Sequence, residues 1–191
     1  MDPDLLKAGL GAVIGFGLAQ AASLAKLLWR VLTSPQLTIK ERGAAAAFLI
    51  HEAEISQGES AREEVYGFTV RNTGRAVATD VRFQLLRLDV RHRNAKGPNT
   101  LIADTLDLSR YGGGSDDKPS ALTLVPHAEV QVEVGRWRED WDCLRPSAPG
   151  AGEYYEESAS GASEYMLKVA TFDGKGHYAT ADLRISRSSR R

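Results

Sequence analysis

Apolar and polar residues alternate with a period of two along most of the chain, most clearly in 66–70, 81–90, 130–134 and 165–185. This period is typical of half-buried antiparallel strands, because successive side chains point to opposite faces of a sheet. With 36–41 as a first strand, we expect about six to eight strands separated by turns. The pattern therefore predicts an all-β protein, built as an antiparallel β-sandwich.

Two local features refine the strand pattern. The apolar positions change phase between Leu85 and Leu86, which predicts a β-bulge or a bend there. The tripeptide Asn72-Thr73-Gly74 ends one strand, and we expect Gly74 to take the positive φ that such a turn often needs.

Two further turns predict hairpins. Pro126-His127 separates Leu122 and Leu124 from the alternating run 130–134, which is typical of two neighbouring strands. The stretch 173–176 (Asp-Gly-Lys-Gly) separates two longer alternating runs and predicts the final hairpin of the chain.

Three segments depart from this scheme. The alanines of 43–56 favour a helix, whereas Phe48 and Ile50 also permit a strand, so both structures remain open. The segments 94–119 and 146–163 contain many Gly, Pro and Ser residues and are predicted to be long loops, the second of them mobile.

Composition excludes several classes of protein. Of the 191 residues, 42% are hydrophobic and 26% charged, and 24 basic side chains nearly balance 25 acidic ones. This balance argues against a nucleic-acid partner and against a disordered chain. Because Cys143 is the only cysteine, a disulfide framework and any site built from several thiolates are excluded.

The amino-terminal segment 8–25 contains no charged residue, and its apolar character continues through Leu27 to Trp29. About 20 apolar residues suffice to cross a bilayer, so this segment is predicted to be a transmembrane helix with Trp29 as an interfacial anchor. Two alternatives stay open. Ala19-Gln20-Ala21 resembles a signal-peptide cleavage site, and the helix is also compatible with packing inside an oligomer.

Small residues recur every fourth position within this segment, at Gly11, Gly15, Ala19 and Ser23. Such a stripe allows two helices to approach closely in lipid, so self-association through this face is a hypothesis.

Positive charges predict the orientation of the helix. Lys7 alone precedes the segment, whereas Lys26, Arg30, Lys40 and Arg42 lie at its end or after it. The positive-inside rule then places the C-terminal part in the cytoplasm. The absence of an N-glycosylation sequon agrees with that location.

No motif for catalysis or metal binding is complete. His51-Glu52 begins like the zinc motif H-E-x-x-H, but Ile55 stands where the second histidine must be. Cys143 is expected to be a packing residue, since nothing near it in sequence would lower the pKa of its thiol. We therefore expect no enzyme activity, no cofactor and no metal site.

Two tryptophans are the candidate binding residues. Trp137 and Trp141 are compatible with an exposed binding ridge, although large aromatic residues more often anchor a sandwich core. The C-terminal stretch 184–191 carries four arginines and no acid, and it is compatible with a disordered tail or with binding to anionic lipid.

Three stretches resemble the immunoglobulin-like and CARDB-like modules of bacteria. VYGFTVRNTGRAVATDVRFQL (65–85) has the strand, N-x-G and following strand of those modules. LTLVPHAEVQVEV (122–134) and YMLKVATFDGKGHYATADLRI (165–185) resemble their last two hairpins. The resemblance covers 37–185 and implies an immunoglobulin-like sandwich with a role in adhesion, scaffolding or ligand presentation. It implies no catalytic residue.

The sequence thus predicts three parts: a transmembrane or anchoring helix (1–35), an immunoglobulin-like β-sandwich (36–187) and a basic tail (188–191). We expect a single-pass membrane protein that contacts lipid and binds a protein partner or itself. The alternative is a module with the opposite topology, which faces the cell envelope and recognises another surface or a carbohydrate.

Overall fold

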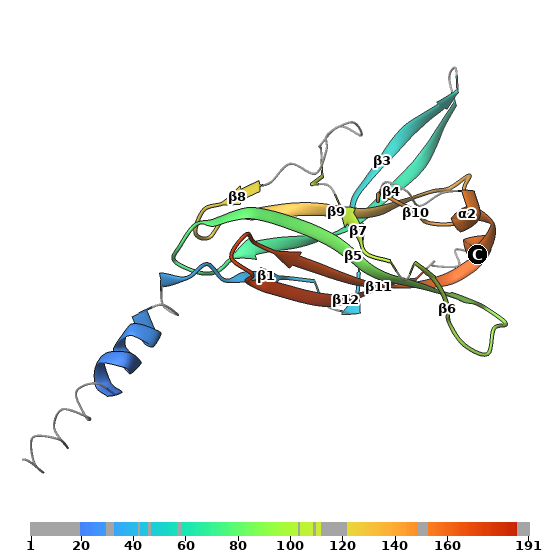
Figure 1. Cartoon of the computed structure of the whole chain (residues 1–191). Helices are drawn as coiled ribbons and strands as arrows, with labels where there is room; N and C mark the ends of the chain where they lie inside the picture. Colours follow the sequence, from blue (N-terminus) through green and yellow to red (C-terminus); the bar gives the residue numbers. More distant parts are fainter. Residues whose placement is uncertain are drawn as a thin grey trace, which may run out of the picture.

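The computed structural model describes residues 20–29, 33–41, 43–45, 47–56, 59–102, 104–108, 110–111, 122–148 and 153–186. These residues form two sheets, packed face to face as a β-sandwich, with few helical residues (Figure 1). All strand pairs are antiparallel except one. The prediction of an all-β sandwich is confirmed.

The first sheet, sheet A, is centred on β4, which pairs with β9 along one side and with β1 and β3 along the other. Its strands are β1 (Leu37–Ile39), β3 (Ala47–Ser56), β4 (Glu59–Asn72), β9 (Glu129–Arg138) and β10 (Arg145–Pro146). The hairpin of β3 and β4 projects beyond the body of the sandwich (Figure 1).

The second sheet, sheet B, is centred on β5 and β11, with the long β12 beside β11. Its strands are β2 (Gly43–Ala44), β5 (Ala78–His92), β6 (Asn99–Ile102), β7 (Leu106–Leu108), β8 (Leu122–Leu124), β11 (Ala162–Phe172) and β12 (Tyr178–Ser186). The three short strands β6, β7 and β8 follow one another along the free side of β5.

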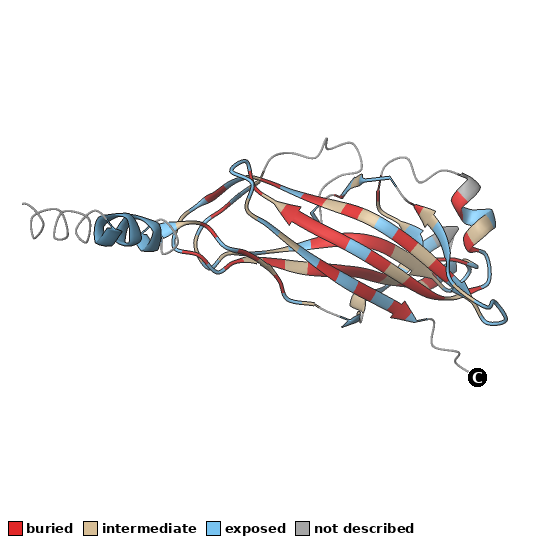
Figure 2. Cartoon of the chain, turned by 60° about the horizontal axis from the view of Figure 1, so that its bottom comes forward, coloured by how far each residue is buried: buried red, intermediate tan, exposed pale blue. Residues whose placement is uncertain are grey.

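The core lies between the sheets, where buried and exposed residues alternate along each strand (Figure 2). Phe68 faces the interior from sheet A, and Leu85, Leu88 and Leu167 face it from sheet B; all four are at most 2% exposed. Burial of a side chain of this size stabilises a fold by about 1.5–3 kcal/mol, so these positions supply much of the driving force.

Two predicted features of sheet B are confirmed. β11 and β12 form a hairpin in continuous register from Glu164↔Ser186 to Phe172↔Tyr178. In the pairing of β5 with β11, Lys168 lies opposite Arg87 and Val169 opposite Leu85, so Leu86 is the extra residue of a bulge.

The predicted hairpin around Pro126-His127 is wrong. β8 pairs with β5 in sheet B, whereas β9 pairs with β4 in sheet A, so the turn connects the two sheets. His127 takes a φ of 65° there, and its amide donates to the carbonyl of Asn72 at 2.7 Å. Alternation fixes which face of a strand is buried but not which strand lies beside it, which explains the error.

The positive φ expected for Gly74 is absent. Positive φ angles among the described glycines occur at Gly43, Gly161 and Gly176. Gly74 is required for a different reason, because a Cβ there would lie 2.4 Å from the carbonyl oxygen of Ser34.

The open segment 43–56 forms strands, not a helix, because β4 offers its free edge to β3 and tertiary pairing outweighs alanine propensity. The predicted loop 94–119 contains β6 and β7. The predicted mobile segment 146–163 contains α2 (Glu153–Ala159), whose Tyr155 and Ala159 are buried in the core. That segment is therefore ordered along α2.

At the amino terminus, 20–29 are helical and exposed, and β1 begins at Leu37, next to the predicted boundary between 1–35 and 36–187. Within the part of the chain that is described, no helix is long and apolar enough to span a membrane. Most of the predicted span 8–25 lies outside the described residues, as do Gly11, Gly15, Ala19 and the tail 188–191.

Candidate functional site

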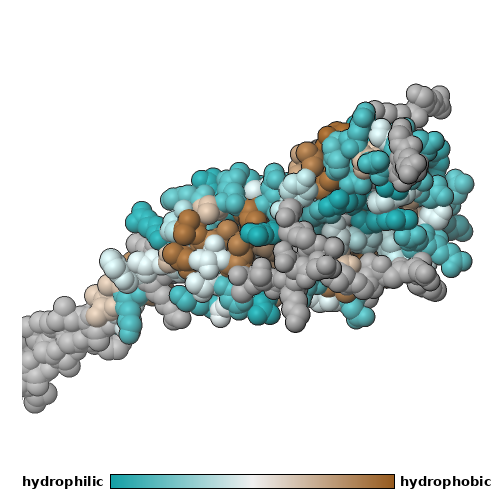
Figure 3. Space-filling model, turned by 90° about the horizontal axis from the view of Figure 1, so that it is seen from above, coloured by the Kyte–Doolittle hydropathy of each residue, from teal (hydrophilic) through white to brown (hydrophobic). Residues whose placement is uncertain are grey.

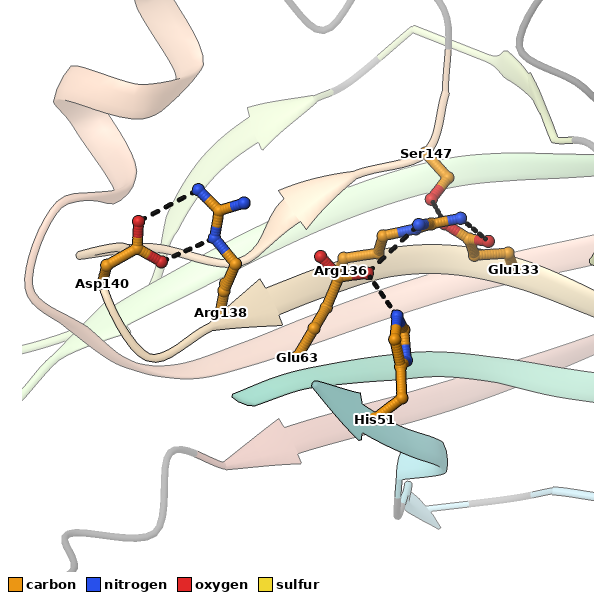
Figure 4. A network of polar contacts seen from close by, with 7 residues as sticks. All are labelled: His51, Glu63, Glu133, Arg136, Arg138, Asp140 and Ser147. Carbon is orange, nitrogen blue, oxygen red and sulfur yellow. Dashed lines mark hydrogen bonds and ion pairs between the residues drawn. The ribbon is translucent and has the colours of Figure 1, made fainter. Parts of the chain in front are cut away.

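A buried ion-pair network lies on the face of sheet A that points away from the core (Figure 4). Arg136 on β9 donates from Nε and Nη2 to the two carboxylate oxygens of Glu133, at 2.6 and 2.9 Å. Its Nη1 donates to Glu63 on β4 at 3.1 Å. Glu63 and Glu133 are 5% and 7% exposed. One guanidinium thus forms ion pairs with two carboxylates that would be costly to bury alone.

Two further residues extend the network to the neighbouring strands. Nε2 of His51, on β3, lies 3.5 Å from Glu63, and the hydroxyl of Ser147, just after β10, donates to Glu133. Hydrogen bonding to Glu133 raises the pKa of Arg136 above its ordinary value, which keeps the guanidinium charged. Since its groups bond to one another, we interpret the network as a connection between β3, β4, β9 and β10.

Next to the network, the turn after β9 presents Trp141. The guanidinium carbons of Arg138 and Arg145 lie 4.5 and 4.0 Å from the centroid of its ring, which is the distance of a cation–π contact. Arg138 is held by Asp140 through two hydrogen bonds of 2.6 and 3.0 Å (Figure 4). Trp141 is itself half-buried, so part of its surface remains accessible.

The indole borders a cavity of about 510 Å³ between this turn and α2. Its lining is polar and acidic, and consists of Asp140, Trp141, Asp142, Cys143, Arg145, Glu156, Glu157 and Ser160. Arg145 pairs with Glu156 across the cavity at 3.1 Å. The bond from Arg138 lowers the pKa of Asp140, so that carboxylate is ionised at neutral pH.

This site combines a half-buried indole ring, carboxylates and two guanidinium groups. Such a set can bind cationic and polar side chains of a partner. Among the described residues, no group of three or more His, Cys, Asp or Glu side chains is arranged to hold a metal ion.

A second hollow, of about 740 Å³, lies on the same sheet beside Lys40, Thr69, Tyr111 and Glu129. Lys40 and Glu129 are paired at 2.7 Å, and Tyr111 meets Phe48 edge to face with ring centroids 5.0 Å apart. Lys40 and Glu129 are therefore engaged with each other, and Glu41 accepts from the amide and the hydroxyl of Thr69.

The structure separates the two predicted tryptophans. Trp137 packs against the hydrophobic core, as expected of a structural residue, whereas Trp141 borders the cavity. They do not form one ridge. Cys143 is 5% exposed and belongs to the core, as predicted for a packing residue. Ser23 lies on the exposed N-terminal helix.

Sequence reasoning did not find Arg145 or Glu63 as parts of a site. Glu156 comes from the segment 146–163, which was predicted to be a loop, and the helix α2 in that segment brings it to Arg145 on β10. For Glu63 and Arg136 a weak signal existed, since charged residues in alternating strands mark a sheet face. No model of a protein family matches the chain, and a comparison with curated protein sequences finds no match either.

Proposed function

We propose that this chain is a membrane-anchored, non-catalytic β-sandwich that binds a protein partner or organises an assembly. The observation that carries the proposal is the accessible ring of Trp141, set between two arginines beside an acidic cavity. Tryptophan and arginine are the residues most enriched at the centres of protein interfaces. Near Trp141, Arg138 is held by Asp140 and Arg145 by Glu156, which fixes both guanidinium groups beside the indole ring.

Within this proposal, the β-sandwich is of the immunoglobulin-like type. In support, β1, β4 and β9 are neighbours in one sheet, and β12, β11 and β5 in the other, as in the A-B-E and G-F-C orders of that fold. β2 runs parallel to β12, so the first strand changes sheets. The phenol of Tyr165, near the start of β11, accepts from the amide of Leu144, which lies 21 residues earlier in the chain.

The partner surface that we infer is cationic. The cavity is lined by four carboxylates, of which Asp140 and Glu156 are paired with Arg138 and Arg145. The exposed Glu157 adds an acceptor for lysine or arginine side chains of a partner. The cavity lies at the end of the sandwich opposite to the N-terminal helix, where an anchored domain would present it away from the membrane (Figure 1).

A photo-crosslinking experiment tests the binding proposal. We would place p-benzoylphenylalanine at Trp141, with Thr180 on the exposed side of β12 as control, and irradiate cells that produce the full chain. We expect one discrete heavier adduct from position 141 and none from 180. Glu157→Lys should reduce the yield of that adduct, whereas Glu54→Lys on the projecting hairpin should not. Equal adducts at both positions, or none at 141, would contradict the proposal.

The anchor and its orientation belong to the same proposal, with the C-terminal domain in the cytoplasm. They are supported by the uncharged segment 8–25 and by the positive charges that follow it. A C-terminal tag that stays with carbonate-washed membranes and is protected from protease until spheroplasts are lysed is the expected result. Digestion in intact spheroplasts would favour the envelope-facing alternative.

A further inference from the structure

Exposed apolar side chains gather at the amino-terminal end of the molecule. Of the nine large apolar residues that are exposed in the described part of the chain, four lie on the N-terminal helix: Leu24, Leu27, Leu28 and Trp29. Three more, Val77, Val125 and Tyr178, belong to the turns of the sandwich nearest that helix. We call the turns 72–77, 124–128 and 173–178 the loop end. Figure 3 shows apolar residues gathered on the part of the body closest to the helix.

Val77 and Val125 lie at the same end of the pairing of β5 with β8, although 48 positions separate them in sequence. Ala78 lies opposite Leu124 as the last pair of that ladder, and each valine is the residue next to one member of the pair. The side-chain amide of Asn72 donates to Ala76 at 2.8 Å and to Leu124 at 3.0 Å, which joins the two turns directly before each valine. Val77 is 40% and Val125 54% exposed.

The loop end is firmly connected to the chain that follows the N-terminal helix. The amide of Thr73 donates to Gln36 at 2.7 Å, and the amide of Gly174 donates to Thr79 at 2.9 Å. Gln36 is seven residues after Trp29, a length of chain that spans at most about 25 Å. A surface that Trp29 contacts therefore lies close to the loop end.

The charges at this end are mainly basic. Arg75 and Lys175 are exposed and form no ion pair with another described residue. Of the nearby acids, Asp173 is 3% exposed and Asp80 is paired with Arg82 at 3.2 Å. Exposed apolar side chains with basic ones nearby are the two elements by which a protein surface binds an anionic membrane.

We propose that the loop end rests on an anionic phospholipid bilayer, with Val77 and Val125 among the headgroups and Arg75 and Lys175 on lipid phosphates. This inference rests on the membrane anchor proposed above. It adds a second contact that fixes the orientation of the sandwich and points the Trp141 cavity away from the membrane.

The test measures where the loop end lies in the membrane-bound protein. The full chain is reconstituted with vesicles of phosphatidylcholine and phosphatidylglycerol (3:1), with the dye NBD on Val77→Cys or Val125→Cys. Ser160→Cys, at the opposite end, is the matched control, and unmodified protein controls for the buried Cys143. We expect nitroxide-bearing lipid to quench NBD at 77 and 125 at least twofold more than at 160. Arg75→Gln with Lys175→Gln should abolish that difference.

The outcomes separate the two proposals. If the protein floats with the vesicles but positions 77 and 125 behave like 160, the docking is overturned while the anchor remains. If the protein does not float with them, both proposals fail. If NBD at 77 and 125 is already blue-shifted without lipid, the helix or a second copy of the chain covers the loop end, and the lipid proposal is overturned.

Discussion

Arg136 forms a bidentate ion pair with Glu133, although residues three apart in a regular strand face opposite sides of the sheet. The bulge in β9 explains the contact. Tyr66 pairs with Gly135 and Gly67 with Glu133, so Val134 is an extra residue that brings Arg136 to the side of Glu133. A local irregularity thus builds the network that connects four strands.

Arg136→Gln should destabilise the fold, because it leaves Glu63 and Glu133 buried without a counter-charge. We expect a loss of about 2–3 kcal/mol in the free energy of unfolding, below the cost for a fully buried pair because Arg136 is 43% exposed. Urea denaturation of the full chain measures this. The control is Arg87→Gln, whose pair with Asp89 is more exposed and should change stability by under about 0.5 kcal/mol. Equal effects of both variants would show that the network contributes no more than a surface pair.

Asn72 connects three segments at the loop end, and it is fully buried. Besides its two donated bonds, its side-chain oxygen accepts from the amides of Gln36 and Gly74 at 3.2 and 3.1 Å. Asn72→Ala leaves these groups without their partner, so we expect unfolding to require about 3 kcal/mol less. The midpoint of urea denaturation should fall, and exposed Asn94→Ala should leave it unchanged. An unchanged midpoint for Asn72→Ala would mean that water replaces the side chain.

Gly67 allows the ring of Phe48 to lie against β4. A Cβ at this position would lie 2.1 Å from the carbonyl oxygen of Val132 and 2.5 Å from the Phe48 ring. Gly67→Ala should therefore lower the melting temperature by several degrees, since a clash with backbone is relieved only by moving a strand. Gly97→Ala, where a Cβ meets nothing within 4 Å, is the control and should be neutral. If both variants have the same melting temperature, β4 and β9 can move apart at Gly67 with little loss of stability.

The sequence predicted those parts of the fold that follow from local pattern. Alternation identified the β11–β12 hairpin, and the phase shift at Leu86 identified a bulge, because both depend on which face of a strand is apolar. Alternation could not predict that β8 and β9 belong to different sheets, since the same pattern is compatible with pairing to each other or to strands of separate sheets. In β9 the apolar run continues evenly through Val134, so nothing in the pattern marks the second bulge or the pairing of Arg136 with Glu133.

The candidate site was less predictable than the fold. Trp141 was predicted as a candidate binding residue because tryptophan is common at binding surfaces. Its neighbours Arg145 and Glu156 meet only because α2 packs Tyr155 into the core. A stretch rich in Pro, Gly and Ser hides that helix, whose seven residues are ordered by tertiary packing rather than by propensity. A site formed by such packing can be recognised only in the folded structure.

The turn between β11 and β12 should make stability depend on pH in the acid range. Asp173 is buried, and its carboxylate accepts from the amides of Lys175 and His177 at 2.9 Å and contacts Nδ1 of His177 at 3.0 Å. Burial acts to raise the pKa of Asp173, but these hydrogen bonds outweigh it and hold the pKa below its ordinary value.

Because the pKa of Asp173 is lower in the folded than in the unfolded state, its contribution is complete above the ordinary value of about 4 and disappears as the pH falls through the folded-state value. Asp173→Asn should reduce the free energy of unfolding by about 2 kcal/mol at pH 7. The difference in the free energy of unfolding between the unchanged protein and the Asp173→Asn variant should become smaller below about pH 4. Urea titrations between pH 7 and pH 3 measure it, with exposed Asp182→Asn as the control. A difference that stays constant over this range would mean that the Asp173 carboxylate does not titrate with unfolding.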